Sequence, residues 1–228
     1  MAPESLTPEA LTPEAFVAEL DARNQARLAD LAAKSAAGEP SDALDVPQLL
    51  KLALRNELEA SELAAFWMID TPELDARLAL ARQCGDEAKH YRWIEERLAA
   101  LRVDLAGFDP QAPGLSPLSA YLRTLSGTAE RAAAGPFTRE ALAVARNEVF
   151  AAFCAERGDA ETAALYRERI QPDERHHHEL GRRLLLRYAV TDEQQARARA
   201  AAETTLRIAD ELQEMARLKA GVCRAPGC

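Results

Sequence analysis

The sequence predicts an all-α protein. Alanine, leucine, glutamate and arginine dominate its 228 residues, while the β-branched valine and isoleucine are scarce. No segment alternates apolar and polar residues with the strict period of two that a half-buried strand shows. The 10 glycines and 12 prolines gather in a few places, which leaves long helical segments between them. A chain of this length can bury a full core as one unit, so we expect a single domain over residues 1–228.

Helix-start and helix-stop signals divide the chain into segments. Thr-Pro-Glu, which occurs twice in "SLTPEALTPEAF" and again in "DTPE", is a start signal because threonine caps the first turn and proline fits there. "TDEQ" forms a capping box with Thr191 and Gln194. Breaks are expected at "GEPSDALDVP", "GFDPQAPGLSP", "AGP" and Gly158. The expected helices cover about 13–37, 47–69, 72–101, 117–134, 138–157, 159–189 and 191–220.

These helices group into two hairpins and two flanking helices. Residues 47–101 and 138–189 each contain two long helices joined by a short turn, and a long crossover, 102–137, connects them. This order predicts a four-helix bundle. The additional helices, about 13–37 and 191–220, lie outside that core. An apolar line on the last helix could cover the bundle or form the seam of a homodimer, and it consists of Leu206, Leu212, Met215 and Leu218.

Charge and composition exclude several classes of protein. A net charge of −9 argues against a nucleic-acid partner. We find neither a basic segment followed by an apolar one at the start nor an apolar run of about 18 residues, so we expect a soluble, cytoplasmic protein with no membrane partner. The four cysteines form no CxxC pair, which excludes a zinc knuckle or a rubredoxin-type knot. Cys223 and Cys228 in "CRAPGC" could close a small disulfide, bind a soft metal or remain reduced.

Two Glu-x-x-His motifs are the strongest chemical signal. "GDEAKHYRW" places Glu87 three residues before His90, and "QPDERHHHEL" places Glu174 three residues before His177. Residues three apart share one face of a helix, so each motif aims a carboxylate and an imidazole at the same point. His178, four residues after Glu174, could compete with His177.

Each motif has a partner glutamate on the preceding helix. "RNELEASELA" from Arg55 and "RNEVFAAFCA" from Arg146 share the pattern R-N-E-x-x-A-x-x-x-A, which selects Glu57 and Glu148. At about 100° per residue, Glu57 lies in the middle of an apolar arc. The arc around Glu148 is equally apolar and holds Ala141, Val144, Ala145, Ala151, Ala152 and Ala155. We therefore expect both glutamates to point into the bundle.

Four carboxylates and two imidazoles would then meet among alanines and leucines. Buried carboxylates without compensation are costly, and four of them repel one another. Two divalent cations would cancel this charge and turn the carboxylates into ligands. Oxygen-rich coordination with two histidines favours two iron ions, with manganese possible, over a structural zinc. The predicted metal ligands are Glu57, Glu87, His90, Glu148, Glu174 and His177.

The order Glu, Glu-x-x-His, Glu, Glu-x-x-His over four helices resembles that of ferritin-like di-iron carboxylate proteins, including rubrerythrins and di-iron oxygenases. The resemblance covers about residues 47–189 and implies a ferritin-like four-helix bundle. It also implies that Glu87 and Glu174 bridge the two metals while the other four ligands hold one metal each.

The same resemblance implies an oxidase or oxygenase that activates dioxygen and acts on a small organic substrate, with an electron donor that the sequence does not identify. The alternative within the family is iron handling or peroxide removal, as in ferritins and rubrerythrins. Ferritin storage subunits have no histidine on the fourth helix of the site, whereas this sequence has a histidine in both halves. Classical rubrerythrins carry a CxxC-type iron knot, which this sequence does not have. Both differences favour the enzyme. A third possibility is a non-catalytic helical interaction protein with a vestigial site.

Overall fold

The computed structural model describes residues 10–37, 45–221 and 225–227, and every regular element within them is a helix. The all-α prediction is thereby confirmed. With η denoting a π-helical segment, the elements in chain order are α1 (Pro13–Ala37), α2 (Val46–Asp70), α3 (Leu74–Ala100), α4 (Pro117–Leu122), α5 (Thr128–Ala132), η1 (Ala133–Arg139), α6 (Glu140–Glu156), α7 (Ala160–Ala164), η2 (Leu165–Ile170), α8 (Gln171–Tyr188) and α9 (Asp192–Ala220).

Side-chain caps fix several helix starts. Thr191 and Gln194 form the predicted capping box at the start of α9, and Asp45 with Gln48 forms another at the start of α2. Thr71 in "DTPE" was expected to cap α3, and this expectation is wrong. The Thr71 hydroxyl donates instead to the Trp67 carbonyl, 2.7 Å away, and so completes the end of α2.

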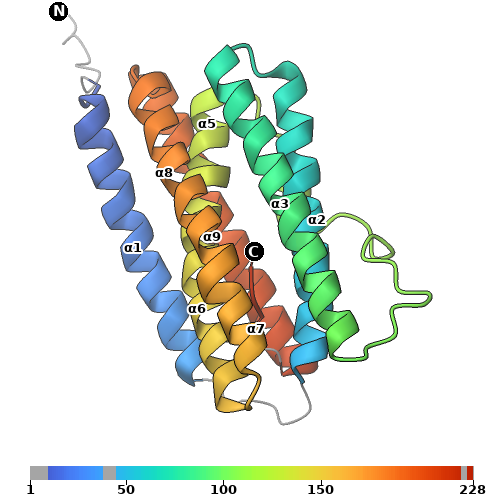
Figure 1. The fold of residues 1–228 in the computed structure, drawn as a ribbon. Coiled ribbons are helices and arrows are strands. Elements are labelled where there is room, and N and C mark those ends of the chain that lie inside the picture. The colour runs from blue at the N-terminus through green and yellow to red at the C-terminus, as the bar shows by residue number, and fades with distance from the viewer. Residues whose placement is uncertain (1–9, 38–44, 222–224, 228) are drawn as a thin grey trace, which may run out of the picture.

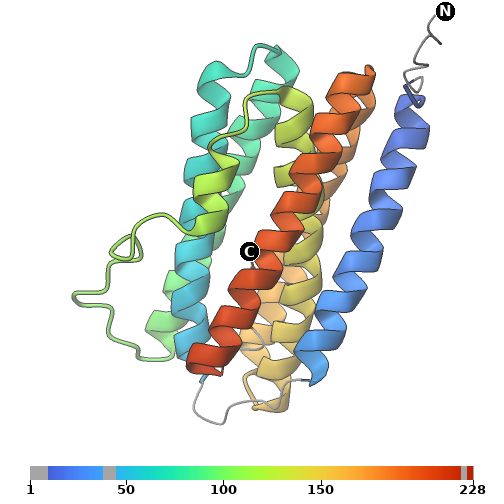
Figure 2. The same ribbon diagram turned by 180° about the vertical axis from the view of Figure 1, so that it is seen from behind.

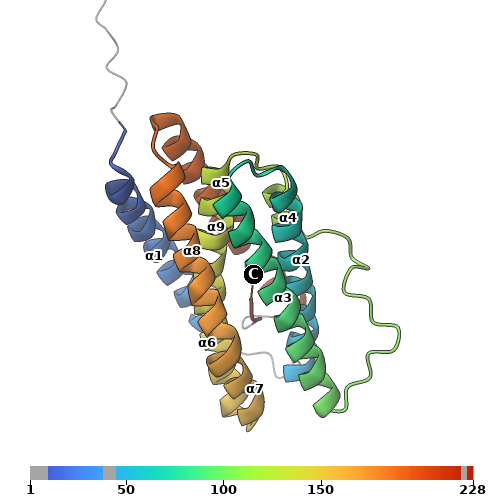
Figure 3. The same ribbon diagram turned by 45° about the horizontal axis from the view of Figure 1, so that its top comes forward.

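Two antiparallel hairpins form the centre of the molecule (Figure 1). α2 and α3 form the first hairpin, while α5, η1 and α6 run continuously and pair with α7, η2 and α8 to form the second. α1 packs against α6, α8 and α9. α9 packs on α5 and η1, on the face turned to the viewer in Figure 2. The view in Figure 3 shows the two hairpins as separate layers. Residues 226–227 lie between them, hydrogen-bonded to Asn56 on α2 and to Asn147 on α6.

Apolar clusters occupy both ends of this arrangement. One contains Leu50, Ile94 and Phe150, and others toward the opposite end contain Trp67 and Phe137. The buried acidic and histidine side chains lie on the helices of the two hairpins, between these clusters.

The second hairpin departs from the predicted helix boundaries. A stop was expected at "AGP", but Gly135 and Pro136 lie inside a helix that continues to Glu156, and the break falls at residues 123–127 instead. The wider π-helical turn, in which the Glu140 N–H donates to the Gly135 carbonyl, accommodates the proline that would break an α-helix. The crossover therefore ends at residue 127 rather than 137.

The apolar line on α9 divides into two parts. Leu206 is buried against the bundle, whereas Met215 and Leu218 are exposed. The first half of α9 thus covers the bundle, which is one of the two roles that the sequence predicted for this apolar line. Among the described residues, no helix has the length and apolar character needed to cross a membrane.

Candidate metal centre

Two overlapping groups of buried side chains could each hold a metal ion. Glu57, Glu87, His90 and Glu174 form one group, and the ligand atoms that they offer lie within 4.8 Å of one another. The second group consists of Glu87, Glu140, Glu174 and His177, and its ligand atoms also lie within 4.8 Å of one another. Glu87 on α3 and Glu174 on α8 belong to both groups, which suits carboxylates that bridge two ions. Five of the six predicted ligands are thus brought together.

The sixth prediction, Glu148, is wrong. Its side chain is 53% exposed and accepts hydrogen bonds from Arg167 Nε and Nη2 at 3.1 and 3.0 Å. Of the apolar arc around it, only Ala151 is buried. Eight residues separate Glu148 from Glu140, and at about 100° per residue this turns the two side chains about 80° apart. That rotation takes Glu148 out of the interior.

Glu140 occupies the place expected for Glu148. It is the first residue of α6, directly after η1, and only 2% of it is exposed. Gln83 Nε2 on α3 donates to Glu140 Oε1 at 2.8 Å and to Glu87 Oε1 at 3.4 Å. The glutamine therefore helps to fix one carboxylate from each hairpin.

Both imidazoles point one nitrogen into the cluster and the other at an aspartate of the opposite hairpin. His90 Nδ1 lies 3.2 Å from Glu87 Oε2, and its Nε2 lies 3.3 Å from Asp173 Oδ2. His177 Nδ1 lies 3.5 Å from Glu87 Oε1, and its Nε2 lies 3.2 Å from Asp86 Oδ2. A carboxylate on the outer nitrogen fixes the ring and the tautomer of a metal-binding histidine.

Neither aspartate was among the predicted site residues, although the sequence contains a signal for both. Asp86 directly precedes Glu87 and Asp173 directly precedes Glu174, so the full repeat is Asp-Glu-x-x-His. Lys89 Nζ joins the two, at 2.8 Å from Asp86 Oδ1 and 3.3 Å from Asp173 Oδ2.

His178 does not compete with His177. Its Nδ1 donates to the Phe137 carbonyl at 2.7 Å, and its ring stacks on that of Phe137 with 4.7 Å between centroids. His178 is therefore tied to η1, whereas His177 is fully buried in the cluster. Cys223 and Cys228 lie outside the described residues, so the predictions for the tail cysteines stay predictions.

Burial and mutual repulsion leave the cluster holding protons. Burial raises the pKa of Glu57 to about 7, although hydrogen bonding to His90 opposes the rise. Burial and then the charges of Glu87 and Glu140 raise the pKa of Glu174 well above its usual range. Burial alone would lower the pKa of His177, but its hydrogen bond to Asp86 and the negative charges of Glu87, Glu140 and Asp86 together outweigh this effect and raise the pKa to about 9.

Two potential ligand atoms in the cluster have no hydrogen-bond partner among the described residues. Glu174 Oε2 and His177 Nδ1 are buried, and among the described residues neither has a hydrogen-bond partner. Buried polar atoms are normally satisfied, and these two lie 3.6 Å from each other inside the cluster. A donor set of four carboxylates and two imidazoles with such orphaned atoms fits a pair of divalent cations.

Metal binding is expected to release protons and to strengthen as the pH rises through about 7. A metal needs Glu57 and His177 without their protons, and in the metal-free protein the pKa values of these groups are about 7 and about 9. Protons therefore compete with the metal more strongly at lower pH. Calorimetric titration with Co²⁺ in two buffers of different ionisation enthalpy counts the released protons. Affinity that stays constant from about pH 6 to 8, without proton release, would contradict these pKa shifts.

Comparisons with known proteins add no name to this site. A scan of protein-family models finds no match to the chain, and neither the curated proteins nor the solved structures contain a match.

Proposed function

We propose that the chain is a ferritin-like di-iron carboxylate protein that works as an oxygen-activating oxidase or oxygenase on a small organic substrate. The observation that carries the proposal is the pair of overlapping ligand groups, each with a histidine of its own and both sharing Glu87 and Glu174. Carboxylate-rich sites with one imidazole per metal suit iron or manganese. Two hairpins joined by a crossover, with the ligands facing one another inside, fit the ferritin-like pattern.

The protein's own residues would hold and orient this centre. Glu57 and His90 would bind one ion, Glu140 and His177 the other, and Glu87 and Glu174 both. Bound ferrous ions would supply the electrons and the open coordination positions for reduction of dioxygen.

The surrounding side chains would keep the centre dry and fixed. Asp86 and Asp173 hold the imidazoles in position, and the apolar clusters at either end of the bundle exclude water. Tyr166 on η2 is fully buried, and its hydroxyl has no partner among the described residues. Burial, and then the charges of nearby groups that include Glu57 and Glu174, raise the pKa of Tyr166 well above its usual range, so its hydroxyl stays protonated.

Anaerobic loading with Fe²⁺ followed by exposure to dioxygen tests the proposal. We expect two irons per chain and rapid oxygen consumption, with the near-ultraviolet absorption of a coupled ferric pair and no growth of a ferric mineral. Continued uptake of iron into a mineral would favour iron storage instead. A chain that binds less than one iron would show the site to be vestigial and would overturn the proposal.

A further inference from the structure

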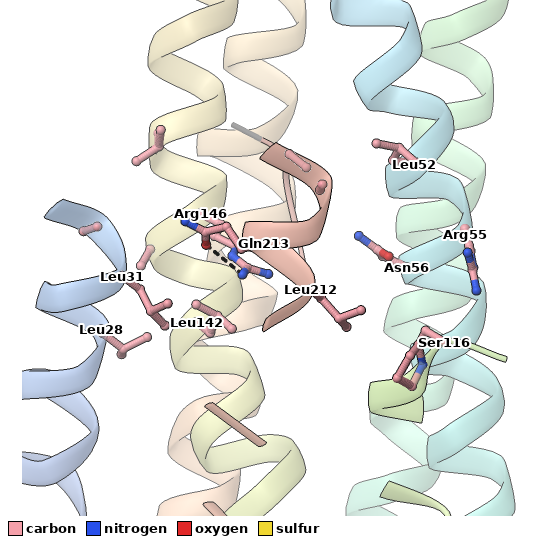
Figure 4. Close-up of a pocket in the computed structure, with 16 residues that line it drawn as sticks. Leu28, Leu31, Leu52, Arg55, Asn56, Ser116, Leu142, Arg146, Leu212 and Gln213 are labelled. Carbon is pink, nitrogen blue, oxygen red and sulfur yellow. Dashed lines mark hydrogen bonds between the residues drawn. The ribbon is translucent and has the colours of Figure 1, made fainter. Parts of the chain in front are cut away.

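A cavity of about 290 Å³ lies between α1, α2, α6 and α9 (Figure 4). Its volume is close to the lower limit of about 300 Å³ for pockets that hold small molecules. Aliphatic side chains from all four helices form most of its wall, and they include Leu28, Leu31, Leu52, Leu142, Val149 and Leu212. The cavity therefore suits a short aliphatic chain rather than a large lipid or a partner helix.

The charged residues in the wall are positive. Arg55 and Arg146 line the cavity, and no aspartate or glutamate is among the described residues of its wall. Arg55 is paired with Glu59 at 2.9 Å. Arg146 Nη2 donates to Gln213 Oε1 at 3.0 Å, the bond drawn in Figure 4, and its Nη1 donates to the Gly227 carbonyl at 3.4 Å. A carboxylate would form a shorter, charge-assisted bond with this guanidinium than the Gly227 carbonyl does.

A short segment near the C-terminus, residues 225–227, separates the cavity from the metal centre. Ala225 lines the cavity, while Pro226 and Gly227 are buried. A Cβ atom placed on Gly227 would lie 3.9 Å from Glu57 Oε1. The segment thus reaches from the cavity wall to a carboxylate of the centre.

Two asparagines clamp this segment. Asn56 Nδ2 donates to the Pro226 carbonyl at 3.1 Å, and the Gly227 N–H donates to Asn147 Oδ1 at 2.8 Å. These are the asparagines of the duplicated "RN" in "RNELEASELA" and "RNEVFAAFCA". The repeat that misidentified Glu148 as a ligand therefore has a different role, because each half of the chain uses its asparagine to hold residues 225–227.

We propose that the cavity binds a short aliphatic monocarboxylate, whose head group displaces Gly227 from Arg146 and thereby removes residues 225–227 from the path to Glu57. The proposal rests on the proposed function and gives its site a substrate class and an entry route. The chain of the ligand would occupy the apolar cavity, and its carboxylate would take the guanidinium donor that now holds the Gly227 carbonyl. Entry of the ligand and opening of the path would then be one event.

Titration of the metal-free protein with octanoate tests the binding site. We expect octanoate to bind and heptyltrimethylammonium, which has the same seven-carbon alkyl chain and the opposite charge, not to bind. Arg146→Gln should weaken octanoate binding at least about tenfold, whereas Arg207→Gln, at an exposed position on α9, should leave it unchanged. Ala145→Trp, which fills the cavity, should abolish binding, and Leu78→Trp on the exposed face of α3 should not. Equal binding by all four variants, or none by the native chain, would overturn the proposal.

Hydrogen–deuterium exchange of the C-terminal peptide tests displacement. Octanoate should speed exchange of the Gly227 amide severalfold, toward the rate in Asn147→Ala, where that amide has lost its acceptor. Octanoate that binds without changing this rate would show that residues 225–227 stay in place and would refute the entry route. Both measurements use protein without metal. Failure of octanoate binding is therefore distinguishable from failure of iron loading, which tests the proposed function.

Discussion

The Glu140→Ala variant is expected to lose tight binding at one of the two metal positions, while Glu148→Ala keeps both. Glu140 is buried within 4.8 Å of the other ligand atoms of its group, whereas Glu148 faces solvent and Arg167. Loss of residues that only orient a ligand costs about 10- to 100-fold in metal affinity, so loss of a ligand itself should cost more than about 100-fold. Competition titration with a chelator, monitored by Co²⁺ absorption, measures the affinity of each position.

Glu140→Gln separates ligation from packing. Glutamine keeps the volume of Glu140 and its contact with Gln83 but removes the negative charge that a cation needs. We expect weak binding in Glu140→Gln as well, together with an unchanged helical circular dichroism spectrum. If Glu148→Ala, and not Glu140→Ala, lost a metal, the ligand set that the structure brings together would be incorrect.

Gly181→Ala is expected to destabilise the fold by about 3 kcal/mol or more, because α8 and η1 approach each other at this position. A Cβ atom on Gly181 would lie 2.4 Å from the Phe137 backbone nitrogen and 2.7 Å from the Pro136 carbonyl carbon. Both are backbone atoms of the π-helical segment, so they cannot move aside as the end of a side chain can. Urea denaturation of the metal-free protein measures the free energy of unfolding.

Gly85→Ala is the matched control for this prediction. Gly85 also lies inside a long helix, α3, but a Cβ atom there would meet nothing within 4 Å. Alanine in an open helical position should stabilise the protein by about 0.5–1 kcal/mol. A Gly181→Ala protein as stable as the native chain would show that α8 and η1 can separate without cost.

The helices were largely predictable because their signals are local. Capping at Thr191 and the breaks in composition place α1, α2 and α9 within one residue of their observed bounds. Glu57 and the two Glu-x-x-His motifs were also predictable, because α2, α3 and α8 are regular α-helix where these residues lie and a wheel of about 100° per residue applies to them.

Glu140 was not predictable by the same means. In the first hairpin, Glu57 precedes Glu87 by 30 residues. In the second, Glu148 precedes Glu174 by 26 residues and Glu140 precedes Glu174 by 34, so both glutamates differ from the first hairpin's spacing by four residues. The repeated "RN" then favoured Glu148, although those residues hold the segment 225–227. Two π-helical segments, η1 and η2, also change the register of the second hairpin relative to the first, and no local propensity marks such segments.

Because each imidazole finds its acceptor on the opposite hairpin, neither hairpin is a self-sufficient metal-binding unit. Asp86 serves His177 and Asp173 serves His90, so a fragment cut in the crossover would carry ligands whose rings are free to turn. Two such fragments would have to complement one another in trans. Any rotation of one hairpin against the other would disturb both histidines together, so we expect such a rotation to weaken binding at both metal positions at once.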